Sequence, residues 1–250
     1  MKILDKILQK YKNYAKNHGY ACDICGVELF DYPRRRACEN CVKTLYGEAK
    51  SVCPKCGRQA VTNSVCLTCK SRVPAFNKGF SPFAYEGEIA LQINRLKNGN
   101  RRLACFFAEE MTNYFLNKVE KESLNEILIV PVPLTEEKRK IRGYNQAEDL
   151  AEHLQETLIK LGVDCQMDRE VLQKKRETEN QKTLGFFDRA DNVAGVYHLH
   201  KRKVCKGKTI LLIDDIITTS ATASACASLL LAAGAEKVYA LCIASVPEHR

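Results

Sequence analysis

The sequence contains no apolar run long enough to cross a bilayer, which takes about 20 consecutive apolar residues. It also lacks the marks of a secretory signal peptide. The opening segment, MKILDKILQKYKNYAKNHGY, carries lysines throughout and has neither a continuous apolar core nor a small-residue cleavage site. These absences argue against export, and therefore against a secreted disulfide scaffold, although the chain has 13 cysteines. We expect a cytoplasmic protein without an integral membrane segment, whose cysteines are reduced or bound to metal.

The N-terminal segment, residues 1–20, has a helical pattern of its own. Its apolar residues recur at the spacing of one helix face: Ile3, Leu4, Ile7, Leu8 and Tyr11. This predicts a short amphipathic helix over residues 3–15. Because its amphipathic character is modest, we favour packing on its own domain over binding to a membrane surface.

A nucleotide-binding P-loop, G-x-x-x-x-G-K-[ST], is also missing. The nearest candidate is Gly207-Lys208-Thr209, but Arg202 stands where the first glycine is required. This segment also precedes a predicted strand, whereas a P-loop follows one. The acidic pair described below is therefore not the Walker B strand of an NTPase.

Eight of the cysteines fall in four C-x-x-C pairs between residues 22 and 69. A C-x-x-C turn aims two sulfur atoms at one point, and two such turns complete a tetrahedral shell around Zn²⁺. We predict two zinc sites within a module over residues 21–72, and we favour pairing in sequence order over a cross-braced arrangement, which stays open. The two predicted sets are Cys22, Cys25, Cys38 and Cys41, and Cys53, Cys56, Cys66 and Cys69.

These predicted sites are structural rather than catalytic, because four cysteines leave no open coordination position. A module of this size buries little core, so the metal would supply folding free energy. If two Zn²⁺ ions are bound by eight thiolates, the formal net charge of +9 falls to about +5. The segment DYPRRRAC places Arg34, Arg35 and Arg36 in one loop, which either contacts nucleic acid or protein or is simply solvated.

Residues 73–250 have an α/β pattern, after the linker KSRVPAFNKGF. Strands are predicted in GFSPFAY, EILIVPVPL, GKTILLIDD and KVYALCIASV. Helices are predicted in EGEIALQINRLKNGN, RRLACFFAEEMTNYFLNKVEK, NQAEDLAEHLQETLIKLG and residues 222–233. Strands that alternate with helices imply a mostly parallel sheet, with binding sites at the carboxyl ends of its strands.

Two adjacent carboxylates, Asp214 and Asp215, end the predicted strand in KTILLIDDIITTSAT. A hydroxyl-rich loop follows and enters a helix, whose N-terminal N–H groups favour an anion. The carboxylates would repel a bare phosphate chain. They suit a sugar phosphate, whose hydroxyls donate to the carboxylates while its phosphate lies in the loop.

The segment ILLIDDIITTSAT resembles the ribose-phosphate signature of type I phosphoribosyltransferases. VPVPLTEEKRKIRGYNQAEDLA and KRETENQKTLGFFDRADNVAGVY, together with the cysteine module, resemble the competence protein F (ComF) family. That family includes proteins linked to DNA uptake and to gluconate utilisation. The resemblance covers nearly the whole chain from Cys22. It implies a type I phosphoribosyltransferase fold, an α/β fold with a Rossmann-like parallel sheet, and a small N-terminal double zinc-binding module.

The resemblance also implies roles for individual residues toward 5-phosphoribosyl-1-diphosphate. Asp214 and Asp215 would bind the ribose hydroxyls, with Arg176 and Arg189 as further catalytic residues. The 5′-phosphate would lie against Thr218, Thr219, Ser220, Ala221 and Thr222. The diphosphate would lie near Arg139, Arg142 and Gly143, and a closing loop would contribute Arg176, Thr178 and Gln181, supported by Arg189 and Asn192.

Some of these segments also have a purely structural interpretation. RGYNQAEDLA can be a helix start capped by Asn145. Lys97, in RLKNG, matches the family pattern but can also cap a helix C-terminus. Ser220 stands where the family usually has glycine, which adopts positive φ freely, so phosphate binding is expected to survive more readily than turnover.

Two functions follow from the resemblance. The first is a Mg²⁺-dependent phosphoribosyltransferase with an unidentified acceptor. The second is a non-catalytic protein that senses 5-phosphoribosyl-1-diphosphate or binds single-stranded DNA and assists DNA uptake beside a competence helicase or motor protein. Backbone contacts to DNA do not need the sugar site, so DNA binding that survives loss of Asp215 would distinguish the two.

Overall fold

The computed structural model describes residues 20–46, 51–60, 62–120, 124, 126–174 and 195–248. The chain divides into two compact units, Met1–Ala49 and Lys50–Arg250. The two cysteine sets fall in different units, so a single module over residues 21–72 stays a prediction. The helix predicted over residues 3–15 lies outside the described residues.

The described part of the first unit is organised around its cysteines. A bridge between Ala21 and Glu28 closes the first C-x-x-C turn, and the second turn leads into α2, Glu39–Tyr46. Within this turn the amide N–H of Gly26 donates to the carbonyl of Cys22 at 2.9 Å, and Gly26 has a φ of 76°. Glycine adopts this left-handed conformation without strain, which explains its place after the second cysteine.

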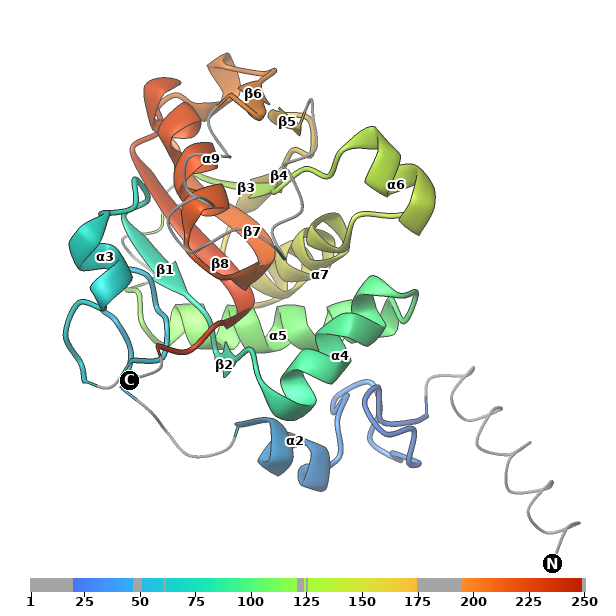
Figure 1. The fold of residues 1–250 in the computed structure, drawn as a ribbon. Helices are drawn as coiled ribbons and strands as arrows, with labels where there is room; N and C mark the ends of the chain where they lie inside the picture. The colour runs from blue at the N-terminus through green and yellow to red at the C-terminus, as the bar shows by residue number, and fades with distance from the viewer. Residues whose placement is uncertain are drawn as a thin grey trace, which may run out of the picture. The chain divides into compact units, whose positions relative to one another are not determined.

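The second unit is built on a parallel sheet of the order β1-β8-β7-β3-β4, with β2 also paired to β8 (Figure 1). Every pairing in this sheet is parallel. Its strands are β1 Lys78–Phe80, β2 Phe83–Ala84, β3 Ile127–Pro131, β4 Cys165–Met167, β7 Thr209–Ile217 and β8 Lys237–Ser245. A separate antiparallel ribbon pairs β5 Leu172–Lys174 with β6 Tyr197–Leu199.

Helices cover both faces of the sheet (Figure 1). On one face α5, Arg102–Leu116, packs on α7, Gln146–Lys160, and both contact the central strands. On the other face Leu128, Ile210 and Leu212 form one buried cluster with α9, Ala221–Ala232. The remaining helical segments are α3 Leu67–Ser71, α4 Gly87–Lys97, α6 Glu136–Arg142 and η2 Lys203–Cys205.

The predicted parallel α/β architecture is confirmed, with some differences in detail. GFSPFAY forms two short strands instead of one, because Ser81-Pro82 interrupts the pairing and proline has no N–H to donate. The helix α6 and the strands β4, β5 and β6 were not predicted. Within the described residues, no helix has the length and apolar character needed to cross a membrane.

Candidate functional site

The hydroxyl-rich loop connects the carboxyl end of β7 to the N-terminus of α9. Ser220 is the N-cap residue of α9 and has φ 63° and ψ 3°, a left-handed conformation that is unusual for a residue other than glycine. Its Oγ is buried and has no hydrogen-bond partner among the described residues. The first turn of an α-helix has N–H groups without intrahelical partners, and here they lie beside a hydroxyl that has no described partner, which is a suitable arrangement for an oxyanion.

A small pocket lies against this loop. It is lined by Asp214 and by four of the five residues predicted to cradle a phosphate: Thr218, Ser220, Ala221 and Thr222. Thr219 does not line it, and its Oγ1 accepts a hydrogen bond from the N–H of Ala221 at 3.4 Å. The structure thus brings one aspartate and most of the predicted phosphate loop to one place.

Asp214 lies in an electrostatically unfavourable environment. Desolvation, followed by repulsion from Asp215, raises the pKa of Asp214 to about 7. Lys97 and Lys174 oppose this increase, and the N–H of Asp215 donates to Oδ1 of Asp214 at 2.8 Å. Near neutral pH this carboxyl group is therefore present in both its protonated and its ionised form. A ligand that donates hydrogen bonds to it, or that brings a cation close to it, would favour the ionised form.

Asp215 points away from this pocket and is held by two donors. Nζ of Lys97, at the end of α4, is 3.0 Å from Oδ2 of Asp215. Nε2 of Gln146, at the start of α7, donates to the same oxygen at 2.8 Å. Lys97 is therefore more than a helix cap, because its ammonium group forms an ion pair with the second aspartate.

The segment RGYNQ, residues 142–146, joins α6 to α7 and gives each side chain a separate contact. Gly143 ends α6 in a left-handed conformation with φ 77°. Oδ1 of Asn145 accepts from the N–H of Ala147 at 3.0 Å, which confirms the predicted helix cap. The hydroxyl of Tyr144 donates to the carbonyl of Leu96 and accepts from the N–H of Gly99 at 2.9 Å. This segment therefore fixes the end of α4, which carries Lys97, against the start of α7.

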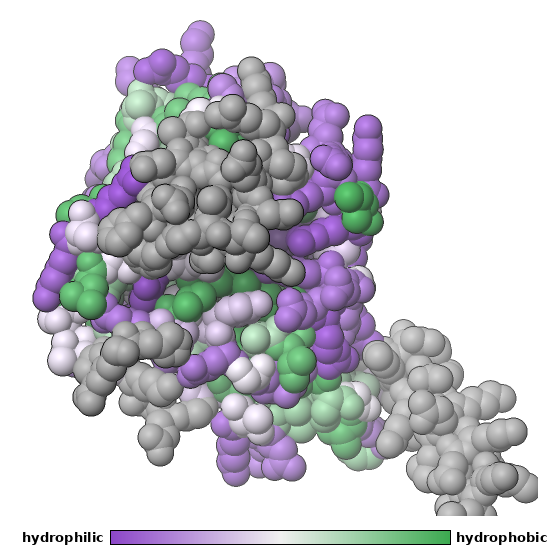
Figure 2. Space-filling model, in the orientation of Figure 1, coloured by the Kyte–Doolittle hydropathy of each residue, from purple (hydrophilic) through white to green (hydrophobic). Residues whose placement is uncertain are grey.

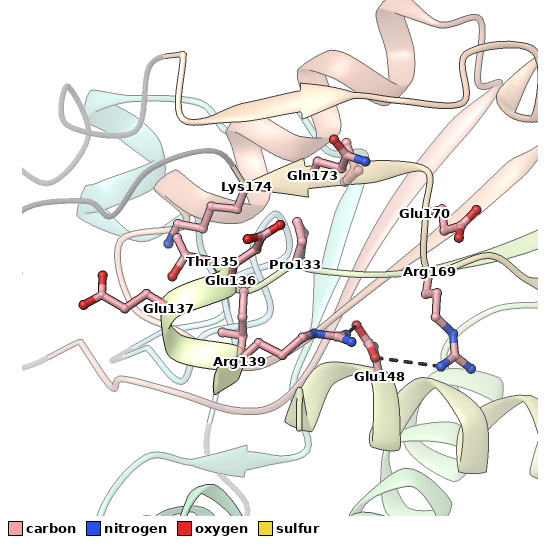
Figure 3. Close-up of a pocket in the computed structure, with 12 residues that line it drawn as sticks. Pro133, Thr135, Glu136, Glu137, Arg139, Glu148, Arg169, Glu170, Gln173 and Lys174 are labelled. Atoms are coloured by element: carbon pink, nitrogen blue, oxygen red, sulfur yellow. Dashed lines mark hydrogen bonds and ion pairs between the residues drawn. The ribbon is translucent and has the colours of Figure 1, made fainter. Parts of the chain in front are cut away.

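A larger, open cavity lies beyond the carboxyl end of β3, between α6, α7 and the ribbon (Figure 3). Figure 3 shows Arg139 and Arg169 on either side of Glu148, and each arginine forms an ion pair with this glutamate. The charged residues that line the cavity are Glu136, Glu137, Arg139, Glu148, Arg169, Glu170 and Lys174. Because carboxylates accompany the cations, an anion here would need a further cation.

The residues predicted to lie near a diphosphate are thus distributed over two environments. Arg139 faces the larger cavity, whereas Nη1 of Arg142 donates to Oε1 of Gln146 at 2.9 Å. None of the residues of α6 is buried, and Figure 2 shows mainly hydrophilic residues over this helix. Five predicted loop residues, Arg176, Thr178, Gln181, Arg189 and Asn192, lie outside the described residues, so their roles stay predictions.

The eight paired cysteines form two groups whose sulfur atoms lie within 4.8 Å of one another, in the sequential pairing that we favoured. Sγ of Cys25 is 3.8 Å from Sγ of Cys38, and Sγ of Cys56 is 3.7 Å from Sγ of Cys66. Four sulfurs at 2.3 Å from a central Zn²⁺ would be separated by about 3.8 Å. Both donor sets therefore fit a tetrahedral Zn²⁺ site.

The second cysteine set is built into the sheet domain. The N–H of Gly79 in β1 donates to the carbonyl of Lys55 at 2.8 Å, and Oγ of Ser81 donates to the carbonyl of Gly57 at 3.1 Å. The N–H of Ala75 donates to Oγ of Ser224, in the first turn of α9, at 2.9 Å. All four cysteines belong to the buried cluster that includes α9. A metal ion here would support the helix that follows the hydroxyl-rich loop.

The three arginines beside the first cysteine set do not form a free basic patch. Arg35 contacts Asp31 and Glu39, each at 3.4 Å. Arg36 lies 3.8 Å from a carboxylate oxygen of Asp23 and donates to the hydroxyl of Tyr32 at 2.9 Å. Acidic groups thus partly neutralise this loop, and Arg34, which is exposed, is a candidate for contact with a phosphate.

Gln146 and Tyr144 were not predicted to be site residues. Tyr144 lies within the segment RGYN and Gln146 directly follows it. Their positions beside a helix start indicated only a helix cap. A signal was available in principle, since an amide next to a capped helix start is suited to satisfy a buried carboxylate. The contact of Gln146 with Asp215 nevertheless spans 69 positions and depends on the packing of α7 against β7.

The family model of the phosphoribosyl transferase domain matches residues 141–250. The competence protein ComFC of Bacillus subtilis (strain 168) is 29% identical over 213 residues, 81% of this chain and 80% of its own length. The DNA utilization protein YhgH of Escherichia coli O157:H7 is 27% identical over 197 residues, 78% of this chain and 84% of its own.

Among solved structures, hypoxanthine-guanine phosphoribosyltransferase from Schistosoma mansoni in complex with IMP is similar over 62% of each chain, at 19% identity. Its TM-score of 0.31 is too low to support residue correspondences. The family match and the parallel sheet confirm the predicted fold class, a type I phosphoribosyltransferase fold whose N-terminal cysteine groups can hold zinc.

Proposed function

We propose that this chain, which is similar to the competence protein ComFC and the DNA utilization protein YhgH, is a member of the competence protein F (ComF) family, and that it binds 5-phosphoribosyl-1-diphosphate with Mg²⁺ and transfers the phosphoribosyl group to an acceptor. The site is the carboxyl end of β7, with Asp214 toward the ribose hydroxyls and the loop of residues 218–222 around the 5′-phosphate. The acceptor is left open, because no described residue identifies it.

One observation carries this proposal: Asp214 and the hydroxyl-rich loop line the same pocket at the N-terminus of α9. The buried Oγ of Ser220 has no partner among the described residues, and a phosphate oxygen would supply one. Helix N–H groups and the threonine hydroxyls would supply further donors. The pocket thus offers donors for a phosphate beside an acceptor for sugar hydroxyls.

The proposed reaction breaks the bond between the anomeric carbon and the diphosphate oxygen, and a nucleophilic atom of the acceptor takes its place. Positive charge develops on the ribose and negative charge on the departing diphosphate. Asp214, close to the ribose, would stabilise the positive charge. Arg139, Arg142 and the loop arginines Arg176 and Arg189 would stabilise the leaving group. Carboxylates line the cavity together with Arg139, so a bound Mg²⁺ would supply the additional positive charge that the diphosphate needs.

Calorimetric titration of the zinc-loaded protein with 5-phosphoribosyl-1-diphosphate and Mg²⁺ tests this proposal. We expect micromolar binding that falls at least tenfold in Asp214→Asn. Thr157→Ser, at a half-buried position of α7 that does not line the pocket, serves as a control. Binding by the unaltered protein would justify screening acceptors for diphosphate release. If the unaltered protein does not bind, the proposed ligand is wrong.

A second candidate function is binding of single-stranded DNA during DNA uptake, beside a helicase or motor protein. The names of the relatives refer to competence and DNA utilization. In the first unit, Phe30 is 88% exposed, and Arg34 lies four residues along the same loop. An exposed aromatic ring beside a cation is suited to stack on a base and contact a phosphate.

Fluorescence titration with a labelled oligothymidylate at two salt concentrations tests this second function. We expect salt-sensitive binding that weakens in Phe30→Ala and Arg34→Ala and survives Asp215→Asn. Arg35→Ala is the control, because Arg35 already contacts two carboxylates. Equal losses in all three first-unit variants would contradict a specific role for Phe30 and Arg34.

A further inference from the structure

The two adjacent aspartates have different surroundings. Asp214 lines the small pocket with the hydroxyl-rich loop, whereas Asp215 is absent from that lining. Successive side chains of a strand point to opposite faces of its sheet, so Asp214 points to the α9 face and Asp215 to the face covered by α7. A pair that looks equivalent in the sequence is therefore divided between two environments.

The Oδ2 atom of Asp215 is already fully engaged. It lies 3.0 Å from Nζ of Lys97 and accepts from Nε2 of Gln146 at 2.8 Å. The side chain of Asp215 is only 9% exposed and that of Lys97 21%, so water competes weakly for this ion pair. Strand β7 is thereby joined to the end of α4 and the start of α7.

The amide of Gln146 is matched to its two neighbours. Its nitrogen donates to Asp215, and its oxygen accepts from Nη1 of Arg142 at 2.9 Å. A carboxylate offers only acceptors and a guanidinium only donors, so a single orientation of the amide satisfies both. Glutamate here would place a second carboxylate against Asp215, and methionine would leave both neighbours without this partner.

Fixing Asp215 also orients Asp214. The backbone N–H of Asp215 donates to Oδ1 of Asp214 at 2.8 Å, so the first carboxylate depends on where residue 215 is held. We infer that Lys97 and Gln146 are positioning residues that fix Asp215, and that Asp214 is the carboxylate that meets the sugar hydroxyls. This inference rests on the proposed function and assigns different roles to the two aspartates.

The charges around Asp214 give the inference a measurable signature. Lys97 lowers the pKa of Asp214, in opposition to desolvation and to Asp215. Removal of the ammonium group therefore raises this pKa further, and ligand binding that needs the ionised carboxylate moves to higher pH. Among the described residues, the titratable and charged groups around Asp214 are Asp215 of β7, Lys97 of α4, Lys174 of β5, Cys226 of α9 and Cys242 of β8.

The first experiment compares Lys97→Met, Lys97→Arg, Gln146→Met and Gln146→Glu by calorimetry with 5-phosphoribosyl-1-diphosphate and Mg²⁺. Inorganic phosphate is titrated separately, because it needs only the loop. We expect Lys97→Met and Gln146→Glu to lose at least tenfold in affinity for the sugar phosphate, with phosphate affinity changed less than twofold. Lys97→Arg, which keeps the positive charge, should retain most of the affinity of the unaltered protein.

The pH midpoint of binding should rise in Lys97→Met but not in Gln146→Met. Lys160→Met, at the exposed end of α7, is the control.

A second experiment needs no ligand. Urea unfolding at pH 8 compares Asp214→Asn with Asp215→Asn, and we expect a lower midpoint only for Asp215→Asn, because this change leaves Lys97 without its anion. Similar losses in both variants would overturn the division of roles, as would unchanged sugar-phosphate binding in Lys97→Met and Gln146→Glu. If the unaltered protein binds no sugar phosphate, the proposed function fails, and with it the assignment of a ligand to Asp214, while the unfolding result still tests the anchoring of Asp215.

Discussion

The backbone of Gly79 in β1 packs directly against the backbone of Cys56 in the second cysteine set. A β-carbon on Gly79 would lie 2.7 Å from the carbonyl carbon of Cys56 and closer still to its oxygen. Gly57 approaches Gly79 equally closely from the other side. The absence of side chains at these two positions is what allows the cysteine turn to pack against the sheet.

Gly79→Ala is therefore expected to destabilise the second unit. The new methyl group overlaps backbone atoms that cannot rotate away, and such overpacking costs about 3 kcal/mol. Gly26→Ala is the control, since no atom lies within 4 Å of its β-carbon position and its φ of 76° alone should cost about 1 kcal/mol. Urea unfolding measures both. A Gly79→Ala protein as stable as the unaltered one would show that the turn can move away from β1.

The two zinc sites should differ in their effect on the sheet domain. Removing Cys66 and Cys69 together, as serines, is expected to lower the main thermal transition and weaken phosphate binding, because the second set packs against α9. The matched change of Cys22 and Cys25 should leave that transition in place, since these residues belong to the other compact unit. Metal analysis should give two Zn²⁺ ions per unaltered chain and one per variant. Equal effects on the transition would contradict the separate roles.

The pH dependence of stability should carry a contribution from Asp214. The pKa of this carboxyl group rises from an ordinary 3.8 to about 7 on folding, chiefly through desolvation. Its contribution to stability is fully present below pH 3.8 and is lost as the pH rises through 7. Asp214→Asn cannot ionise, so it should be more stable than the unaltered protein at pH 8, by roughly 2–4 kcal/mol. The difference should shrink toward pH 5. Parallel stability curves over this range would exclude an elevated pKa.

Ser220 can be tested for strain and for phosphate contact with two substitutions. Ser220→Gly removes the left-handed strain and a buried hydroxyl without a described partner, so stability should rise by about 1 kcal/mol. Ser220→Ala keeps the strain and loses only the hydroxyl. If Oγ donates to a phosphate, both variants should bind inorganic phosphate about tenfold more weakly, in line with about 1.5 kcal/mol for a charged hydrogen bond. Unchanged affinity in both would show that backbone N–H groups alone hold the anion.

The parts of the fold that could be predicted are those with strong local patterns. The apolar run before Asp214 and the small-residue helix after it gave β7 and α9 nearly at their observed bounds. Helix α6 was missed because it has no buried residue, hence no apolar face, although Thr135 and Gly143 mark its two ends. The ribbon strands are too short to show a period.

The candidate site was predictable only where its residues are neighbours in the chain. Asp214 and the hydroxyl-rich loop are contiguous, so their proximity could be inferred. The contact of Lys97 with Asp215 depends on how α4 docks against the sheet, which Tyr144 controls through Leu96 and Gly99. Such a contact is a tertiary property, and one sequence without relatives contains no direct record of it.

The hydrogen bond between Gly79 and Lys55 has a consequence for solubility. Strand β1 stands at the edge of the sheet, and an uncovered edge presents unpaired N–H and C=O groups to other chains. The cysteine turn that carries Lys55 covers this edge. Newly made chains that lack the zinc ion at this turn would therefore expose a strand edge, and we expect them to aggregate more readily than metal-loaded chains.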